Sequence, residues 1–208
     1  MPKTLLARAH TRIRSYGLKK TVRHLCTYVF PKVLLDLRYG GRYCFDQPEL
    51  NKGSGQHALI HTNLTDLVHV FSHACIFPDD VLVDVGCGDG RVLNYWLSLG
   101  LPNKLIGIEF NESVARRAAR AYRKRKNVEV ILGDAAEIAP SCGGTLFYLF
   151  DPLPPDGMNR LELGLRGKPA RILYYNPHFL APFENDSWRI THVPQGEADY
   201  PLAIIAPA

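Results

Sequence analysis

The sequence predicts an α/β fold: a doubly wound, mostly parallel sheet of seven strands that ends in an antiparallel C-terminal hairpin, with a helical extension at the N-terminus. After residue 57, short apolar runs alternate with helical segments, as in parallel sheets covered by helices. Only seven residues, 194–200, join the last two apolar runs, which is too short for a crossover helix. The chain has 208 residues, enough for one such domain and an extension.

Charge divides the chain into a basic amphipathic extension with its linker, residues 1–56, and a domain, residues 57–208. Residues 1–42 contain ten Lys and Arg but one acidic residue, whereas acids outnumber bases in the remainder. Apolar residues recur at steps of three and four within 3–38, which predicts helices. Residues 39–56 are rich in Gly, Pro and polar residues, and this composition indicates a loop or linker.

The basic extension predicts contact with something anionic. Residues 1–42 could cover the functional site of the domain, recruit an acidic partner or rest on an anionic membrane surface. The first of these is slightly favoured, because no other lid is inserted between the fifth predicted strand and the hairpin. A second basic run, 116–126, carries seven Lys and Arg on a predicted helix, and we interpret it as a solvated face. We find no aromatic-interleaved basic surface of the single-strand-binding type in these runs, so nucleic acid is not the expected partner.

The individual elements follow from the apolar pattern and its stop signals. The predicted strands are 81–86, 105–110, 128–134, 145–151, 171–176, 188–193 and 201–207. The predicted helices of the domain include 61–77, 91–100 and 111–125. Thr62, Asn63 or Thr65 should cap the first of these helices and Pro78 should end it, while Asn111 should cap the third.

Cysteine and histidine spacing predicts neither disulfides nor a metal site. The five cysteines are odd in number, scattered and without the paired spacing of zinc ligands. Four histidines look clustered but lack an acidic partner or an HExxH motif, so we interpret them as surface or packing residues: His57, His61, His69 and His73. No apolar run reaches the roughly 20 residues that span a bilayer. We expect a cytoplasmic protein, with peripheral membrane contact through residues 1–42 as an alternative.

The strongest chemical signal is VDVGCGDG, residues 83–90, where a buried strand runs into a glycine-rich turn and then a helix. Glycines allow positive φ and close approach of the backbone to a ligand, while N–H groups at the helix start offer donors. Dinucleotide-binding domains use similar turns. Asp84, however, precedes the first glycine by two residues, where a negative charge suits a cationic ligand better than a pyrophosphate. Arg91 also stands where the dinucleotide motif has its third glycine.

The segment VLVDVGCGDGRVL resembles the first motif of class I S-adenosylmethionine-dependent methyltransferases, in which an acidic residue precedes GxGxG. The resemblance covers about residues 60–207, because the strand count and the hairpin also match. It implies S-adenosylmethionine as the cofactor, with its amino-acid end held by Asp84, Gly86, Cys87 and Gly88. Many members also bring a helix start near the cofactor's carboxylate from just before the first strand, and Thr62 and Thr65 are the candidates for that place.

Two further acids stand at the next two strand ends. Glu109 ends the second predicted strand, where a carboxylate can accept hydrogen bonds from both ribose hydroxyls, and Phe110 follows it in the expected cofactor site. Asp134 follows the third strand. The resemblance implies that its carboxylate accepts from the adenine amino group and that the N–H of Ala135 meets the ring. Three acids at three successive strand ends, in the family's order, predict one cofactor site.

The segment FYLFDPLPP, residues 147–155, is expected to hold the methyl acceptor. In class I methyltransferases the residues after the fourth strand lie beside the transferable methyl group, and amine-methylating members often carry Asn/Asp-Pro-Pro-aromatic there. Asp151 and Pro152 match this pattern and the next two residues do not. The resemblance implies Asp151 as a catalytic base that also touches the cofactor, although a plain loop stop is the alternative. Tyr148 is a second catalytic candidate, and three more residues could line the pocket: Tyr174, Tyr175 and His178.

The predicted function is S-adenosylmethionine-dependent methyl transfer to an acceptor that the sequence does not identify, a small molecule or a protein amine or hydroxyl. The first alternative is a non-catalytic partner protein that binds the cofactor. Such a protein would keep Asp84, Glu109 and Asp134 but would lack a usable acceptor pocket. The second alternative, an NAD-dependent oxidoreductase, is disfavoured by Arg91 and by the terminal hairpin.

Overall fold

The computed structural model describes residues 62–150, 152–196 and 198–208, together with Val22, Leu34 and Arg38. The predicted linker 39–56, the boundary between 56 and 57 and most of the predicted helices within 3–38 lie outside the described residues. The three described residues of the extension are helical and exposed. Arg125 Nη2 donates a hydrogen bond to the carbonyl oxygen of Arg38 at 3.2 Å, which is a contact between the extension and the domain.

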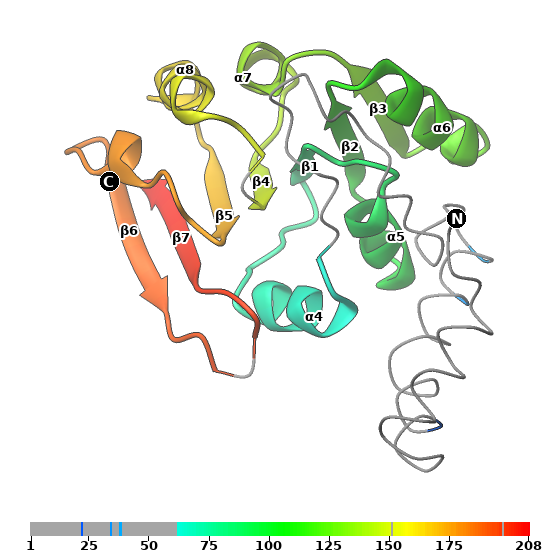
Figure 1. Cartoon of the computed structure of the whole chain (residues 1–208), viewed down its shortest axis with the longest axis horizontal. Helices are drawn as coiled ribbons and strands as arrows, with labels where there is room; N and C mark the ends of the chain where they lie inside the picture. The colour runs from blue at the N-terminus through cyan, green and yellow to red at the C-terminus, as the bar shows by residue number, and fades with distance from the viewer. Residues whose placement is uncertain (1–21, 23–33, 35–37, 39–61, 151, 197) are drawn as a thin grey trace, which may run out of the picture.

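The domain is built on one seven-stranded sheet, and the predicted fold class is confirmed. The strands are β1 (Val81–Val85), β2 (Lys104–Glu109), β3 (Val128–Leu132), β4 (Leu146–Phe150), β5 (Arg171–Tyr175), β6 (Trp188–Val193) and β7 (Leu202–Pro207). Their order is β3-β2-β1-β4-β5-β7-β6, with β1 to β5 parallel and β7 antiparallel to both of its neighbours (Figure 1). The predicted C-terminal hairpin is therefore β6 and β7.

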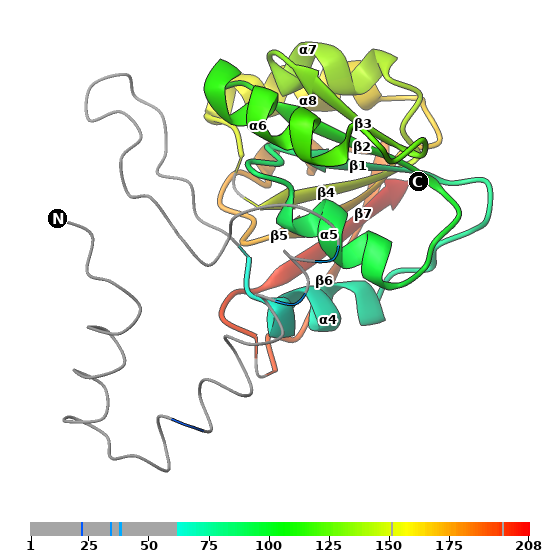
Figure 2. The same cartoon turned by 90° about the vertical axis from the view of Figure 1, so that its right-hand side faces the viewer.

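Helices cover both faces of the sheet. They are α4 (Leu64–Ser72), α5 (Arg91–Ser98), α6 (Glu112–Tyr122), α7 (Ala135–Ile138) and α8 (Pro155–Leu165), with the short 3-10 helices η3 (Ala139–Ser141) and η4 (Ala181–Phe183). In both views α7 and α8 lie on one side of the sheet, and α4 and α5 lie on the other (Figures 1 and 2). This is the layered arrangement that strands alternating with helices predict.

Alternate residues of the central strands point to opposite faces and fill two separate cores. On one face Val83, Phe147 and Ile172 pack with residues of α7 and α8. On the other face Leu82 and Leu146 pack with residues of α4, α5 and α6. Burying one large apolar side chain is worth about 1.5–3 kcal/mol, so these cores provide the main stabilisation that holds the strand ends in place.

The first predicted helix is shorter than expected. The sequence predicts it over 61–77, but α4 ends at Ser72. The carbonyl oxygen of Cys75, three residues beyond this end, accepts a hydrogen bond from Arg171 Nη1 at 2.5 Å. Among the three candidate caps the structure selects Asn63, although its side chain makes no capping hydrogen bond.

Two other helices show where the local pattern succeeds and where it fails. At α6 the predicted N-cap is confirmed, since Asn111 Oδ1 accepts from the N–H groups of Ser113 and Val114 at 3.0 and 3.2 Å. The helix α8 is not among the helices predicted from the sequence. Its segment PDGMNRLELGL contains Gly157 and Gly164, which lower helix propensity, so its stability comes from packing against the sheet.

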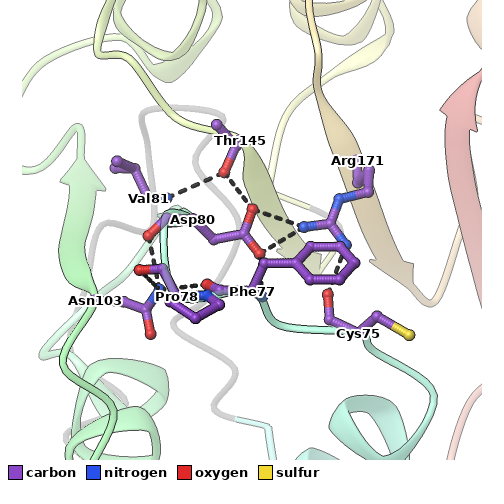
Figure 3. A network of polar contacts seen from close by, with 8 residues as sticks. All are labelled: Cys75, Phe77, Pro78, Asp80, Val81, Asn103, Thr145 and Arg171. Atoms are coloured by element: carbon purple, nitrogen blue, oxygen red, sulfur yellow. Dashed lines mark hydrogen bonds and ion pairs between the residues drawn. The ribbon is translucent and has the colours of Figure 1, made fainter.

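The amino ends of the central strands are joined by one polar network (Figure 3). Arg171 Nη2 at the start of β5 donates to Oδ1 and Oδ2 of Asp80 at 2.7 and 2.6 Å, and Thr145 donates to Oδ1 at 2.7 Å. Asn103 Nδ2 donates to the carbonyl oxygen of Asp80 at 2.9 Å. Burial alone raises the pKa of Asp80, but hydrogen bonds from Arg171, the N–H of Phe77 and Thr145 together lower this pKa below its usual value. We call these five residues the amino-end clamp: Phe77, Asp80, Asn103, Thr145 and Arg171.

Within the described residues, none of the helices is long and apolar enough to cross a membrane. The same part of the chain holds no group of three or more His, Cys, Asp or Glu residues placed to bind a metal ion. The rings of His69 and His73 pack edge to face with their centroids 5.0 Å apart. His57 and His61 lie outside the described residues.

Candidate functional site

The carboxyl ends of β1, β2 and β3 form one edge of the sheet, and the three predicted acids lie along it. The strand order changes direction between β1 and β4, and open α/β sheets bind ligands at the carboxyl edge next to such a change. Asp84 lies near the end of β1, Glu109 ends β2 and Asp134 follows β3. The strand register places Asp84 beside Gly107 of β2 and Tyr148 of β4.

The turn between β1 and α5 depends on glycines in the left-handed region. The φ angle is +77° at Gly86, +54° at Gly88 and +91° at Gly90, where a Cβ would add strain. The N–H groups of Gly86 and Cys87 both donate to the carbonyl oxygen of Ile108 at 2.9 Å, which ties the turn to β2. Backbone with little side-chain cover therefore lines the edge of the sheet here.

Asp84 is the most unusual residue of this edge. It is 2% exposed, and Oδ2 finds no hydrogen-bond partner among the described residues. Burial, and then the negative charge of Glu109, raise the pKa of Asp84 well above its usual value. A buried carboxylate without a partner is costly, and a cation placed against Oδ2 would remove this cost. The arrangement therefore suits a cationic ligand.

Glu109 braces the glycine turn from the end of β2. Its Oε2 accepts from the N–H of Gly88 at 2.9 Å, and its Oε1 accepts from the N–H of Asn111 at 2.7 Å. Burial raises the pKa of Glu109, and these two hydrogen bonds oppose the increase. Each carboxylate oxygen can accept a second hydrogen bond, so Glu109 retains lone pairs for two hydroxyl groups.

The side chain of Cys87 faces the protein interior and not the edge. It is 5% exposed, and burial raises the pKa of the thiol well above its usual value. A Cβ at Gly107 would lie only 2.7 Å from Cys87 Sγ, so glycine at this position of β2 makes room for the thiol. Cys87 can therefore offer only its backbone to a ligand.

Asp134 is held by two groups of the protein. Its Oδ1 accepts from the N–H of Ala136 at 2.9 Å and so caps α7, while its Oδ2 pairs with Arg160 of α8 at 2.9 Å. Both contacts leave a further lone pair on each oxygen. Asp134 can therefore still accept a hydrogen bond from a ligand.

The loop that carries Asp134 lies beside the end of β2. The N–H of Gly133 donates to the carbonyl oxygen of Glu109 at 3.0 Å. Phe110, directly after Glu109, is 64% exposed and offers an apolar surface at the edge, whereas Ala135 is buried at the start of α7. The predicted residues of β2 and β3 are thus brought to one place.

The segment after β4 approaches the glycine turn. Asp151, the predicted base, lies outside the described residues. Its neighbour Pro152 is described, and a Cβ at Gly86 would lie 3.0 Å from the Cβ of Pro152. Pro152 is therefore in contact with the turn that follows Asp84.

Tyr148 lies behind the edge and not on it. It is 2% exposed, and its hydroxyl is 2.7 Å from Thr62 Oγ1. Burial raises the pKa of Tyr148 well above its usual value. The carbonyl oxygen of Thr62 also accepts from Arg91 Nη1 at 3.2 Å. This placement favours packing and positioning of Thr62, and a catalytic role for Tyr148 stays a prediction.

The structure does not bring together the other residues expected in an acceptor pocket. Tyr175 lies on the Asp84 face of the sheet, with ring centroids 5.2 Å from Phe150 and 5.7 Å from Tyr200. Tyr174 belongs to the core on the opposite face, so the structure does not bring it to the others. His178 is exposed in the loop after β5.

Three residues contribute to this edge beyond those named from the sequence: Gly107, Tyr122 and Arg160. A glycine inside a strand signals close approach of another group, so the run LIGIEF contains the sign of the first. The hydroxyl of Tyr122 lies 2.7 Å from the carbonyl oxygen of Gly90. Neither this contact nor the ion pair of Arg160 leaves a local sequence pattern, because each joins helices that follow different strands.

Comparisons with known proteins agree with this geometry. Residues 82–146 match the sequence family described as methyltransferase domain. The mitomycin 7-O-methyltransferase MmcR has a TM-score of 0.56 and 17% identity, over 70% of this chain and 54% of that chain. Human N-acetylserotonin methyltransferase, solved with SAM, has a TM-score of 0.57 and 13% identity, over 69% of this chain and 52% of that chain.

An RNA methyltransferase from Salinibacter ruber, solved with S-adenosyl-L-homocysteine, has a TM-score of 0.53 and 18% identity, over 71% of this chain and 94% of that chain. The matched region thus spans about half the length of the first two proteins and nearly all of the third. At these identities the likeness shows a shared fold. No curated protein sequence matches the chain.

Proposed function

We propose that this chain is a class I methyltransferase that transfers a methyl group from S-adenosylmethionine to an amine or hydroxyl acceptor. The fold and the match of residues 82–146 to a methyltransferase domain support this proposal. The acceptor belongs to a small molecule or to a protein side chain. Each part of the proposal is supported by a different part of the carboxyl edge.

The observation that carries the proposal is the unpartnered Oδ2 of Asp84. The protonated amino group of the methionine moiety would supply the missing partner, through a charge-assisted hydrogen bond worth roughly 1.5–3 kcal/mol. A pyrophosphate would instead bring negative charge towards a buried carboxylate that already faces the charge of Glu109. This contrast favours S-adenosylmethionine over a dinucleotide.

The residues at the other strand ends fit the remainder of the cofactor. In this proposal Glu109 accepts from the ribose hydroxyls with its free lone pairs, and Phe110 covers one side of the adenine. Asp134 accepts from the adenine amino group, and the N–H of Ala135 meets the ring. Thr62, held between Tyr148 and Arg91, stands at the methionine end.

When bound, S-adenosylmethionine supplies an activated methyl group, so the chain mainly has to align the acceptor and exclude water. Asp151 would hold the acceptor by accepting a hydrogen bond from its N–H or O–H, and would take a proton from an acceptor that arrives protonated. Pro152, packed on Gly86, would fix this segment against the glycine turn. Phe150 and Tyr175, at the ends of β4 and β5, would form an apolar wall.

We assign residues 1–42 to recruitment of an anionic partner or to contact with an anionic membrane surface from the cytoplasm. Thr62, the first described residue of the domain, contacts Tyr148 and Arg91, while Arg38 of the extension contacts Arg125 between α6 and β3.

Calorimetric titration of the purified chain with S-adenosylmethionine, S-adenosylhomocysteine and NAD tests the cofactor. We expect micromolar binding of the first two compounds and none of NAD. If the protein is folded and binds neither adenosyl compound, the proposal is wrong. Binding of NAD alone would favour an oxidoreductase.

Transfer of labelled methyl groups from S-adenosylmethionine to a cell extract separates an enzyme from a non-catalytic partner protein. Asp151→Ala should leave S-adenosylhomocysteine affinity nearly unchanged and lower transfer on the order of a hundredfold or more. Asp156→Ala, which removes an exposed acid in the first turn of α8, is the matched control and should behave as wild type. Equal transfer by both variants would mean that Asp151 does not hold the acceptor.

A further inference from the structure

Arg160 lies on α8, which follows the expected acceptor segment, yet its side chain reaches the loop after β3. Its Nη2 pairs with Asp134 Oδ2 at 2.9 Å, and its Nη1 pairs with Glu137 Oε1 at 3.3 Å. Asp134 and Glu137 are three residues apart at the start of α7, so one guanidinium spans both carboxylates. The planar fork of arginine allows this double contact, which the single ammonium of lysine cannot reproduce in the same geometry.

The helix that carries Arg160 is fixed against the same loop. Met158 and Leu161 of α8 are fully buried in the core that also contains Ala135 and Ala136. Gly164, one turn after Arg160, packs so closely on η3 that a Cβ there would overlap Pro140. Arg160 therefore projects from a helix that is packed firmly against the region of Asp134.

The ion pair contributes little to folding. The side chains of Arg160 and Asp134 are 48% and 27% exposed, and exposed pairs of this kind add little to stability. The contact instead fixes an orientation. Oδ1 of Asp134 faces the N–H of Ala136 and Oδ2 faces Arg160, so the plane of the carboxylate and the directions of its free lone pairs are determined.

We infer that Arg160 is a positioning residue for adenine recognition: it orients the Asp134 carboxylate towards the 6-amino group and so makes the site prefer a 6-amino purine over a 6-oxo purine. This inference rests on the proposed function, in which Asp134 receives the adenine amino group. A carboxylate in this orientation accepts from an amino group, whereas a 6-oxo group at the same place would meet it with a lone pair.

Titration with S-adenosylhomocysteine and with S-inosylhomocysteine, which carries oxygen in place of the amino group, tests the inference. Wild type should prefer the adenosyl compound by about tenfold or more. Arg160→Gln should weaken binding of the adenosyl compound by about threefold to tenfold and leave binding of the inosyl compound unchanged, so that the preference falls. Arg160→Lys, which keeps the charge, should recover part of the preference. Arg116→Gln, which removes an exposed arginine paired with Glu112 on α6, is the control and should not change it.

The background of Asp134→Asn shows whether Arg160 acts through its partner. There Arg160→Gln should have no further effect on the preference. A preference that is unchanged by Arg160→Gln in the otherwise wild-type protein, or lost equally in both backgrounds, overturns the inference while leaving the cofactor assignment intact. Failure of wild type to bind either compound overturns both the inference and the proposed function.

Discussion

The hydroxyl group of Tyr122 lies 2.7 Å from the carbonyl oxygen of Gly90, so the last residue of α6 is hydrogen-bonded to the end of the glycine turn. The hydroxyl oxygen of Tyr122 is also 2.8 Å from Asn94 Oδ1 in α5. A helix that begins after β2 thus holds the turn that follows β1. This contact explains why position 90 has no room for a side chain.

Gly90→Ala should lower the free energy of unfolding by about 2–4 kcal/mol, because two costs add. The φ angle of +91° strains a residue with a Cβ, and that Cβ would lie 2.5 Å from the Tyr122 hydroxyl oxygen. Gly100→Ala is the matched control, with a φ angle of +69° and nothing within 4 Å of the added carbon. Urea unfolding should show a loss of only about 1–2 kcal/mol for the control. Equal losses of stability in the two variants would mean that Tyr122 moves away from the added carbon at no cost in free energy.

Asp84→Asn should change stability and binding in opposite directions. Burial and the charge of Glu109 raise the pKa of Asp84, so ionising this residue in the cofactor-free protein costs free energy at neutral pH. The variant should unfold at a higher temperature without ligand, yet bind S-adenosylhomocysteine about 10-fold to 100-fold more weakly through loss of a charge-assisted hydrogen bond.

The sign of the pH dependence provides the check on this interpretation. For a carboxyl group with a raised folded-state pKa, stability is highest below the usual value of 3.8 and is lost as the pH rises through the folded-state pKa. The stability advantage of Asp84→Asn should therefore be largest at neutral pH and shrink towards about pH 4. An advantage that does not vary with pH would show that Asp84 is not the group responsible.

Gly107→Ala should disturb the glycine turn from the neighbouring strand. Its added Cβ would lie 2.7 Å from Cys87 Sγ and 3.0 Å from Leu93 Cδ1, an overlap expected to cost about 1–3 kcal/mol of stability and to weaken cofactor binding. Cys87→Ala alone should retain cofactor affinity, because the buried thiol does not face the ligand. The double variant should recover part of the loss, which calorimetry and urea unfolding can both measure. If the double variant recovers neither stability nor affinity, the loss in Gly107→Ala does not come from overlap with the Cys87 thiol.

Asp80→Asn should lower the free energy of unfolding by about 2–3 kcal/mol, because it breaks the ion pair of the amino-end clamp. This is less than the loss of a fully buried pair, since Arg171 is partly exposed. The pKa of Asp80 is lowered in the folded state, so its contribution is present above the usual value of 3.8 and is lost as the pH falls through the lower folded-state pKa. The difference between variant and wild type should therefore be full at pH 7 and shrink below about pH 4. Glu129→Gln, which breaks the half-exposed pair with Lys104, should cost little at any pH.

The sequence predicts most of the sheet and the order of the acids along it. Strand bounds agree with the structure to within one or two residues, because runs such as 81–85 are apolar on both faces and end in glycine. Asp84, Glu109 and Asp134 can be located from these runs alone, since each stands at or next to a strand end. The hairpin also follows from chain length alone, because 194–200 is too short for a helix that crosses over.

What the sequence does not predict depends on contacts between distant elements. The segment after α4 is tied to Arg171, which lies 96 residues beyond Cys75. Tyr148 is buried and its hydroxyl lies 2.7 Å from Thr62 Oγ1, a contact across 86 residues that the run FYLFDP does not indicate. The ion pair of Arg160 depends on the packing of α8, a helix with two glycines. These features come from tertiary packing, which a local pattern does not encode.

The amino-end clamp and the proposed cofactor residues lie at opposite ends of the same strands. Asp80 and Asp84 are four residues apart in the sequence, a separation of about 13 Å along an extended segment. The two groups are therefore too far apart for direct hydrogen bonds or van der Waals contacts between them. Loops at the carboxyl edge can diverge to accept new methyl acceptors while the opposite edge maintains the fold, so the two requirements can evolve, or be engineered, independently.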